Sequence, residues 1–276
     1  MNDIRIVVYT AVFDDYDLLT DPEYTHENLD YICFTDNPDS VTGVWEPRVV
    51  SEYNISSKLM SGKVKTNPHE FFSEYDYSIW IDGNVQITGD PEHLIKTYLS
   101  DTSLAVPSHP ERNCIYKEGE VCISNKKADE KNVRDQLDRY REHGFPEEYG
   151  LSETRVLFRE HNDENVINCM EIWWEEYRNG AERDQLSFEY AIWRSDLDYE
   201  QINLTYDNES GFLRHPHRLP DSPYTDLYDL FLYMHIFGPK STRDTIRLLL
   251  ISIRVLDQRG IRTLLSKLFN RISRSK

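Results

Sequence analysis

Near its start the chain has a nearly unbroken run of apolar residues at positions 4–13, many of them β-branched, and this run constrains the fold more than any other feature. Similar runs at 31–36 and 77–81 end in turn-forming residues. Short runs of this kind predict strands that are buried on both faces of a sheet. Segments with helix-like patterns lie at 57–75 and 91–100. Strands that alternate with helices predict an α/β fold with a mostly parallel sheet.

The later part of the chain contributes further elements to this pattern. Helices are expected at 126–143, 162–179 and 184–193, and strands at 45–50 and 156–158. Asp184 stands where a capping residue would start the last of these helices. Because no internal repeat or low-complexity linker interrupts the chain, we predict one domain over residues 1–240 and a helical tail over 241–276.

The charge balance limits the partners of the protein. Acidic residues outnumber Lys and Arg by 49 to 31, which gives a formal net charge of −18. A surface of this sign repels polyanions, so we expect no nucleic-acid partner. Dense carboxylates of this kind are also typical of salt-adapted proteins, whose surfaces maintain solubility at high ionic strength.

The basic tail is the exception to this acidic composition. Residues 243–276 contain nine Lys and Arg and two acids, interleaved with aliphatic residues. The longest apolar run, 248–253, is too short to span a bilayer. A cationic amphipathic helix can instead lie on an anionic lipid surface, which predicts a peripheral membrane contact. The alternative is a helix pair that packs on the acidic domain through its arginines.

The N-terminus and the cysteines indicate the compartment. The first residues pass directly into the apolar run without the charged and apolar regions of a secretory signal. The four cysteines are widely spaced and form no C-x-x-C pair, which predicts reduced thiols. We therefore expect a cytoplasmic protein, with the tail at the inner face of the cell membrane if it binds lipid.

One short motif carries a chemical signal of its own. Asp82, Gly83 and Asn84 directly follow the apolar run at 77–81. Oxygen ligands two residues apart at the end of a strand can project to the same side and hold Mg²⁺ or Mn²⁺. Such an ion can neutralise a diphosphate leaving group. The same three residues also form a common turn, and turn chemistry alone would explain them.

Nine segments along the chain add a more specific signal. They are VYTAVFDDYD (8–17), YICFTD (31–36), KTNPH (65–69), YDYSIWIDGN (75–84), HPERNCIY (109–116), GLSET (150–154), REHN (159–162), WWEE (173–176) and RDQLSF (183–188). In this order they resemble a family of glycosyltransferase-like domains of plants, bacteria and archaea that was long catalogued as a domain of unknown function. The resemblance implies a GT-A-like nucleotide-sugar fold, with a mostly parallel mixed sheet flanked by helices.

The resemblance also implies a metal site. In such folds an Asp-x-Asp motif holds a metal against the diphosphate of the sugar nucleotide, and here Asp82 and Asn84 occupy the two positions. The amide in place of the second carboxylate lowers the charge of the site and the expected affinity for Mn²⁺ or Mg²⁺. A histidine from the C-terminal part commonly completes the site. His215 is the candidate, with His217 and His235 as alternatives, and each is otherwise an ordinary surface or core histidine.

By position, the matched segments also predict contacts to the donor. The predicted donor-binding residues are Thr10, Phe34, Thr35, Asp36, Lys65, Asp82, Asn84, Arg112 and Gln185. Asp36 would accept a hydrogen bond from the base or the ribose. The alternative for Asp36 is a cap of the turn that follows it. Lys65 and Arg112 would contact phosphate, or would be ordinary ion-pair partners.

Asp184 is the main catalytic candidate. Its carboxylate would deprotonate an acceptor hydroxyl in an inverting enzyme or stabilise a cationic sugar in a retaining one. The competing role is that of an N-cap, for which Asp is a preferred residue. Glu153 and His161 are secondary candidates for the base on the acceptor side.

Together these features predict a glycosyltransferase that moves a sugar from a nucleotide-sugar donor to a glycan or a lipid-linked acceptor. Two alternatives stay open, because a fold does not determine its chemistry. The first is a metal-assisted hydrolase of a lipid or sugar conjugate that uses Asp82 and nearby histidines. The second is a non-catalytic module that binds nucleotide sugars or glycans.

Overall fold

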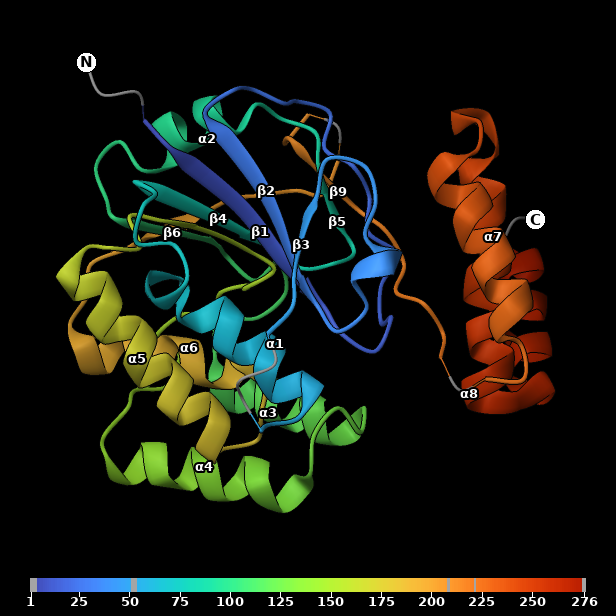
Figure 1. Cartoon of the computed structure of the whole chain (residues 1–276). Helices are drawn as coiled ribbons and strands as arrows, with labels where there is room; N and C mark the ends of the chain where they lie inside the picture. Colours follow the sequence, from blue (N-terminus) through green and yellow to red (C-terminus); the bar gives the residue numbers. More distant parts are fainter. Residues whose placement is uncertain (1–3, 51–53, 208, 221, 275–276) are drawn as a thin grey trace.

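The computed structural model describes residues 4–50, 54–207, 209–220 and 222–274 of the chain. At its centre lies a seven-stranded sheet with the order β3-β2-β1-β4-β7-β6-β8 (Figure 1). The strands are β1 (Ile6–Val12), β2 (Leu29–Thr35), β3 (Glu46–Arg48), β4 (Tyr77–Ile81), β6 (Leu104–Pro107), β7 (Val156–Arg159) and β8 (Glu200–Ile202). Strand β7 runs against the other six, which are parallel. The expected α/β fold, with a mostly parallel mixed sheet flanked by helices, is confirmed.

Strand β1 is an interior strand of the sheet, between β2 and β4. Its side chains alternate between two hydrophobic layers, with Ile6 and Val8 on one face and Val7 and Tyr9 on the other. All four are at most 1% exposed. Because both faces of β1 are covered, its sequence shows no alternation of polar and apolar residues.

Helices cover both faces of the sheet. They are α1 (Ser57–Thr66), α2 (Pro91–Tyr98), α3 (Ile115–Ser124), α4 (Glu130–Glu142), α5 (Glu164–Asn179), α6 (Asp184–Ser195), α7 (Thr225–Phe237) and α8 (Arg243–Arg274). Helices α1, α5 and α6 cover one face, and α3 and α4 pack outside them (Figure 1). Helix α2 and a ribbon of β5 (Val85–Ile87) and β9 (Phe212–Arg214) cover the other face.

Two helices differ from the sequence prediction for local reasons. The helix expected over 57–75 ends at Thr66, because Pro68 has no N–H to donate and restricts the residue before it. Helix α3 is not among the predicted helices, because its central Gly119 lowers helix propensity. A Cβ at Gly119 would lie 2.4 Å from Leu137 Cδ1, so the close packing of α3 on α4 favours glycine there.

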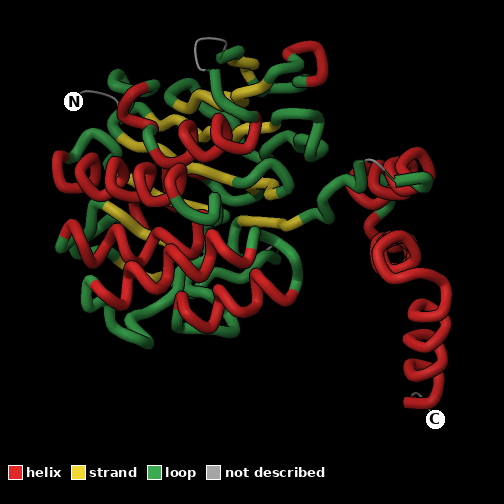
Figure 2. The backbone as a smooth tube through the Cα atoms, turned by 90° about the horizontal axis from the view of Figure 1, so that it is seen from below, coloured by secondary structure: helices red, strands yellow, loops and turns green. Residues whose placement is uncertain are grey.

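Helices α7 and α8 form a hairpin at one side of the domain (Figure 1). Tyr228 and Leu232 of α7 pack with Ile246 and Leu250 of α8 in a small apolar cluster. Helix α8 breaks at Gly260, where φ is 74°, and its second part runs in a new direction (Figure 2). The predicted tail therefore pairs with α7, which lies before residue 240, and the division of the chain at that residue stays a prediction. None of the described helices is long and apolar enough to cross a membrane.

Candidate active site

The candidate active site lies at the edge of the sheet where the parallel strands end. Asp82 directly follows β4, and Thr154 precedes the antiparallel β7, so both reach this edge. Lys65 comes from the last turn of α1 and Asp184 from the first turn of α6. Ligands of open α/β sheets bind at this edge.

Lys65 forms ion pairs with both Asp82 and Asp184. Its Nζ lies 2.5 Å from Asp184 Oδ2, 3.3 Å from Asp82 Oδ1 and 3.4 Å from Thr154 Oγ1. The Lys65 side chain is 7% exposed, whereas those of Asp82 and Asp184 are 28% and 25% exposed. The ammonium group is therefore buried behind two carboxylates that reach the surface.

Two indole groups hold the carboxylate residues in place. Trp80 Nε1 donates to Asp82 Oδ1 at 3.0 Å, and Trp173 Nε1 donates to the Asp184 carbonyl oxygen at 3.0 Å. Both tryptophans are almost fully buried in the layer between the sheet and its helices. Since these rings are fixed by core packing, the positions of Asp82 and Asp184 are fixed with them.

A buried arginine holds the end of α1. Arg159 is 0% exposed, and its Nη1 donates to the Lys65 carbonyl oxygen at 2.8 Å. The Tyr9 hydroxyl donates to the same oxygen at 3.3 Å and accepts from Arg159 Nη2. Burial lowers the pKa of Arg159 and raises that of Tyr9 to about 12. The last turn of α1, which carries Lys65, is thereby tied to the core.

The carboxylate of Asp184 does not cap α6. Arg183 occupies the N-cap position, and Asp184 is the first helical residue. Its Oδ1 accepts from the Gln185 N–H at 3.0 Å, and its Oδ2 accepts from Thr154 Oγ1 at 2.8 Å. Burial raises the pKa of Asp184, but the charges of Lys65 and Arg183 outweigh it, so the pKa lies below its usual range. Asp184 is therefore ionised and weakly basic.

Asn84 lies beside a histidine. Asn84 is 3% exposed, its Nδ2 donates to the His215 carbonyl oxygen at 2.7 Å, and its Oδ1 has no partner among the described residues. His217 Nε2 lies 3.4 Å from Asn84 Nδ2, and His217 Nδ1 lies 2.8 Å from Asp17 Oδ1. A carboxylate behind a histidine fixes its tautomer, so His217 Nε2 carries a lone pair, which here faces the Asn84 amide nitrogen. Burial raises the pKa of Asp17.

The His215 side chain, the metal candidate in the sequence analysis, faces elsewhere. His215 Nε2 lies 3.2 Å from Gln86 Oε1, and its ring packs on His235 with centroids 5.9 Å apart. Burial lowers the pKa of His215 to about 4. In the described part of the chain, no three His, Cys, Asp or Glu side chains are grouped to hold a metal ion. The amide oxygen of Asn84 and the ring nitrogen of His217 nevertheless fit a weakly charged site next to Asp82.

A basic cluster that the sequence analysis missed flanks Asp82. The Arg155 carbonyl accepts from the Asp82 N–H at 2.9 Å, and the guanidinium groups of Arg155 and Arg214 each lie 6.0 Å from the Tyr206 ring centroid. Burial, followed by the charge of Arg155, lowers the pKa of Arg214. Tyr206 Oη is buried without a partner among the described residues. No sequence pattern marks these residues, because β7 and β9 bring them together.

The predicted nucleotide pocket is largely core. Thr10, Phe34 and Thr35 are at most 2% exposed. Thr35 Oγ1 accepts from the Asn37 N–H at 3.0 Å, so Thr35 and not Asp36 caps that turn. Asp36 is exposed, and its Oδ1 accepts from the Asp14 N–H at 3.1 Å, which ties the loops after β1 and β2 together.

The remaining predicted residues line the same edge but have partners of their own. Arg112 Nε donates to the buried Glu118 at 2.6 Å, so its charge is already balanced. Glu153 forms an ion pair with Arg155, and Gln185 Nε2 donates to the Ser152 carbonyl oxygen at 3.5 Å. The structure thus brings Glu153 and Gln185 beside the group formed by Lys65, Asp82 and Asp184.

His161 is the candidate that lies apart from this site. It follows β7 at the opposite edge of the sheet, is 0% exposed, and its Nε2 lies 2.8 Å from the Phe72 carbonyl oxygen. Burial lowers the pKa of His161 to about 4. These contacts are those of a neutral core histidine.

The pKa of His161 leads to a prediction about acid stability. The unfolded state takes up a proton near pH 6.5, but the folded state does so near pH 4, so stability is lost as the pH falls between these values. We expect His161 to account for about 3 kcal/mol of this loss at pH 4. Urea denaturation across this range should give a shallower pH dependence for His161→Gln than for the parent. Exposed His93→Gln should leave the dependence unchanged, and parallel curves for His161→Gln and the parent would contradict the prediction.

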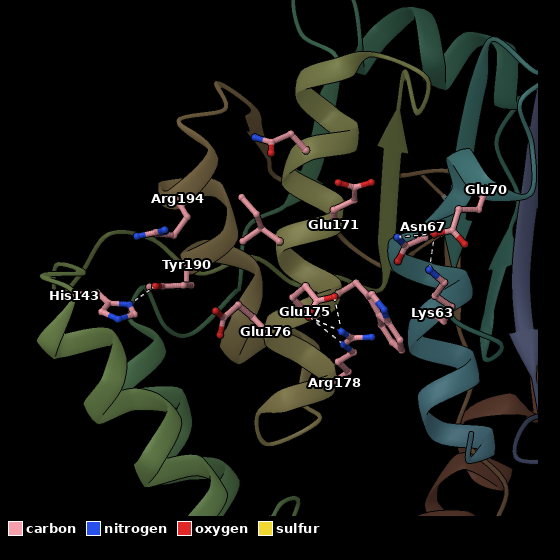
Figure 3. Close-up of a pocket in the computed structure, with 13 residues that line it drawn as sticks. Lys63, Asn67, Glu70, His143, Glu171, Glu175, Glu176, Arg178, Tyr190 and Arg194 are labelled. Carbon is pink, nitrogen blue, oxygen red and sulfur yellow. Dashed lines mark hydrogen bonds and ion pairs between the residues drawn. The ribbon is translucent and has the colours of Figure 1, made fainter. Parts of the chain in front are cut away.

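A cavity of about 620 Å³ lies away from this edge, over the outer side of α5 (Figure 3). Two ion pairs form between its lining side chains. Lys63 Nζ lies 2.5 Å from Glu70 Oε1, and Arg178 Nη2 lies 2.8 Å from Glu175 Oε2. None of the predicted site residues lines this cavity, so we assign no role in catalysis to it.

Comparison with known proteins shows the family of this chain. The family model described as TOD1/MUCI70, glycosyltransferase-like domain, matches residues 1–211. The chain belongs to this family. The resemblance predicted from the nine segments is thereby confirmed. Within the TOD1/MUCI70 match lie Lys65, Asp82 and Asp184, whereas His217 and helices α7 and α8 follow it.

Two relatives from Arabidopsis thaliana carry different names. The first, "Probable hexosyltransferase MUCI70", is 28% identical over an alignment of 212 residues, and the match covers 66% of this chain and 36% of the relative. The second, "Alkaline ceramidase TOD1", is 26% identical over an alignment of 229 residues, and the match covers 69% of this chain and 49% of the relative. The chain thus spans less than half the length of either relative. A solved structure of the bifunctional glycosyltransferase WbbM without ligand aligns with 73% of this chain and 39% of its own, at 12% identity and a TM-score of 0.45.

Proposed function

We propose that this chain is a glycosyltransferase that moves a hexose from a nucleotide-sugar donor to a glycan or a lipid-linked acceptor. The observation that carries the proposal is the buried Lys65 between Asp82 and Asp184, at the ligand-binding edge of a glycosyltransferase-like domain. Such an arrangement offers fixed charges of both signs to a reaction in which a cationic sugar separates from an anionic diphosphate.

The diphosphate of the donor would lie at the basic cluster. Arg155 and Arg214 bring two guanidinium groups next to the Asp82 loop, and Tyr206 Oη is a buried donor without a partner among the described residues. In a chain with a net charge of −18, two neighbouring guanidinium groups are a favourable place for an anion to bind. Guanidinium groups bind phosphate with paired hydrogen bonds, so these arginines would stabilise the leaving group.

Asp184 would stabilise positive charge on the sugar. Its lowered pKa makes it a poor base, which supports this role over removal of a proton from the acceptor. Its three hydrogen-bond donors, Lys65, Thr154 and the Gln185 N–H, fix the carboxylate before the sugar nucleotide arrives. Glu153 lies on the same edge and would serve as the acceptor-side base only after release from Arg155.

A divalent metal would be held by Asp82, Asn84 and His217. The unpartnered Asn84 Oδ1 and the orientation of His217 by Asp17 support this set over one with His215. When bound, Mn²⁺ or Mg²⁺ supplies charge neutralisation of the diphosphate. Gly83 keeps the loop close to Asp17, because a Cβ there would lie 2.9 Å from Val12 Cγ2 and 3.2 Å from Asp17 Oδ2.

Thermal unfolding with a panel of nucleotide sugars, with and without Mn²⁺, tests this proposal. A donor that binds the folded state should raise the melting temperature. The shift should be lost in Arg214→Gln and kept in Arg178→Gln, whose side chain pairs with Glu175 on α5. The donor that shifts the parent should also release its nucleoside diphosphate when acceptor glycans are added. The absence of a shift with every donor would overturn the proposal.

A second candidate function is hydrolysis of a lipid amide. It rests on the relative named "Alkaline ceramidase TOD1" and on the Asp17–His217 pair beside Asp82. Release of fatty acid from ceramide, lost in His217→Gln and independent of any nucleotide sugar, would favour this function over sugar transfer.

A further inference from the structure

Helix α7 presents a large apolar face to solvent. Leu227, Leu230, Tyr233, Met234 and Phe237 are each 43–57% exposed. Their spacing places them on one side of the helix, opposite the residues that pack on α8. A helix with apolar side chains on both sides usually has a partner on each, because exposed apolar surface is unfavourable in water.

Helix α8 carries further exposed apolar side chains. Leu248, Leu249 and Ile251 are 41–52% exposed. Eight of the fifteen exposed large hydrophobic side chains in the described ranges therefore lie on the α7–α8 hairpin. The other seven are spread singly over loops. The domain thus has no matching apolar patch, among its described residues, on which the hairpin of a second copy would dock.

The positive charge of the hairpin favours an anionic partner. Residues 243–276 hold nine basic and two acidic residues, in a chain that is otherwise strongly acidic. Arg247 and Arg259 are exposed in the described part of α8. Apolar side chains next to basic ones fit the boundary between the acyl chains and the head groups of an anionic bilayer. Two such hairpins would instead repel each other.

We propose that the α7–α8 hairpin binds the surface of an anionic phospholipid bilayer. The apolar face of α7 would enter the head-group region, and the arginines of α8 would contact lipid phosphates. The rings of Tyr233 and Phe237 have centroids 4.7 Å apart. Aromatic side chains are favourable at the level of the lipid head groups. The contact is interfacial, since the described helices include none that could span a bilayer.

The hairpin is attached directly to the candidate site. Arg254 Nη2 of α8 donates to the His217 carbonyl oxygen at 2.6 Å and to the Tyr228 hydroxyl at 3.1 Å. Arg218, the next residue in that loop, pairs with Asp229 of α7 at 2.5 Å. A hairpin held on a bilayer would therefore keep the His217 loop close to the lipid surface. Membrane binding itself does not depend on the reaction proposed above.

Co-sedimentation of the full chain with vesicles tests the proposal. We expect binding to vesicles that contain phosphatidylglycerol and little binding to pure phosphatidylcholine, because the arginines need an anionic surface. The triple variant Leu227→Gln, Leu230→Gln and Met234→Gln should bind at least about tenfold more weakly. The matched control is Val44→Gln, Val49→Gln and Ile55→Gln, which removes three exposed apolar side chains outside the hairpin and should bind like the parent.

Circular dichroism and donor-induced thermal shifts would show that both variants remain folded. The proposal is overturned if the parent fails to bind anionic vesicles or if the two triple variants bind equally. It is also overturned if gel filtration shows a dimer that the α7 variant abolishes while vesicle binding is unchanged, because a second copy would then cover this face.

Discussion

Replacement of Asp184 by asparagine is expected to reduce sugar transfer about a thousandfold, because the fixed negative charge that faces the cationic sugar is lost. Asparagine keeps an oxygen to accept the hydrogen bond from Thr154, and Lys65 keeps Asp82 as a partner. The fold and the affinity for the donor should therefore change little. Steady-state transfer rates and donor-induced thermal shifts measure the two effects separately.

Asp198→Asn is the matched control for Asp184→Asn. Asp198 is exposed and lies just after α6, the helix that begins with Asp184. Its replacement removes the same charge at the other end of the same helix and should leave the rate unchanged. If Asp184→Asn retains more than about a tenth of the parent rate, Asp184 does not act on the reacting sugar.

Replacement of Lys65 by methionine is expected to lower the free energy of unfolding by about 3 kcal/mol, because two carboxylates would share a site without their cation. The methionine side chain preserves most of the volume, so the effect reports the charge. Urea denaturation measures it. Lys58→Met on the same helix removes a lysine that is 51% exposed, and it should change stability by less than about 0.5 kcal/mol.

A second substitution checks the cause of this loss. In the double variant Lys65→Met and Asp184→Asn, one of the two unpaired charges is removed. If repulsion and desolvation of the carboxylates cause the loss, the double variant should be more stable than Lys65→Met alone. Equal stabilities of the single and double variants would contradict that explanation.

Asp184→Asn and Lys65→Met together separate the catalytic role of Asp184 from the structural role of Lys65. Asp184→Asn removes a group that faces the substrate, so its effect should appear in the rate. Lys65→Met removes a buried cation, so its effect should appear first in stability. Arg159 and Tyr9 donate hydrogen bonds to the Lys65 carbonyl oxygen. The backbone that carries this cation is therefore fixed by two buried core residues.

Much of the fold could be predicted, because short apolar runs in the sequence indicate which strands are buried. Strands β1, β2 and β4 are apolar runs that end in turn residues, and both properties are visible within ten residues. Helix α3 could not be predicted, because its Gly119 suits contact with Leu137 of α4 and not helix formation. Pro68 is a local signal for the end of α1. The polar and apolar residues after it keep a helix-like spacing, so the sequence predicted a longer helix.

The sequence by itself determined the doubly buried strands, the family and the identity of Lys65, Asp82 and Asp184 as candidates, since motifs and apolar periodicity are local properties. The tertiary structure alone decided their pairing. Lys65 and Asp184 are 119 positions apart, and Asn84 and His217 are 133 apart. Whether a charge is balanced or a histidine is oriented depends on which distant side chains the folded core brings within hydrogen-bond distance, and no local pattern encodes that.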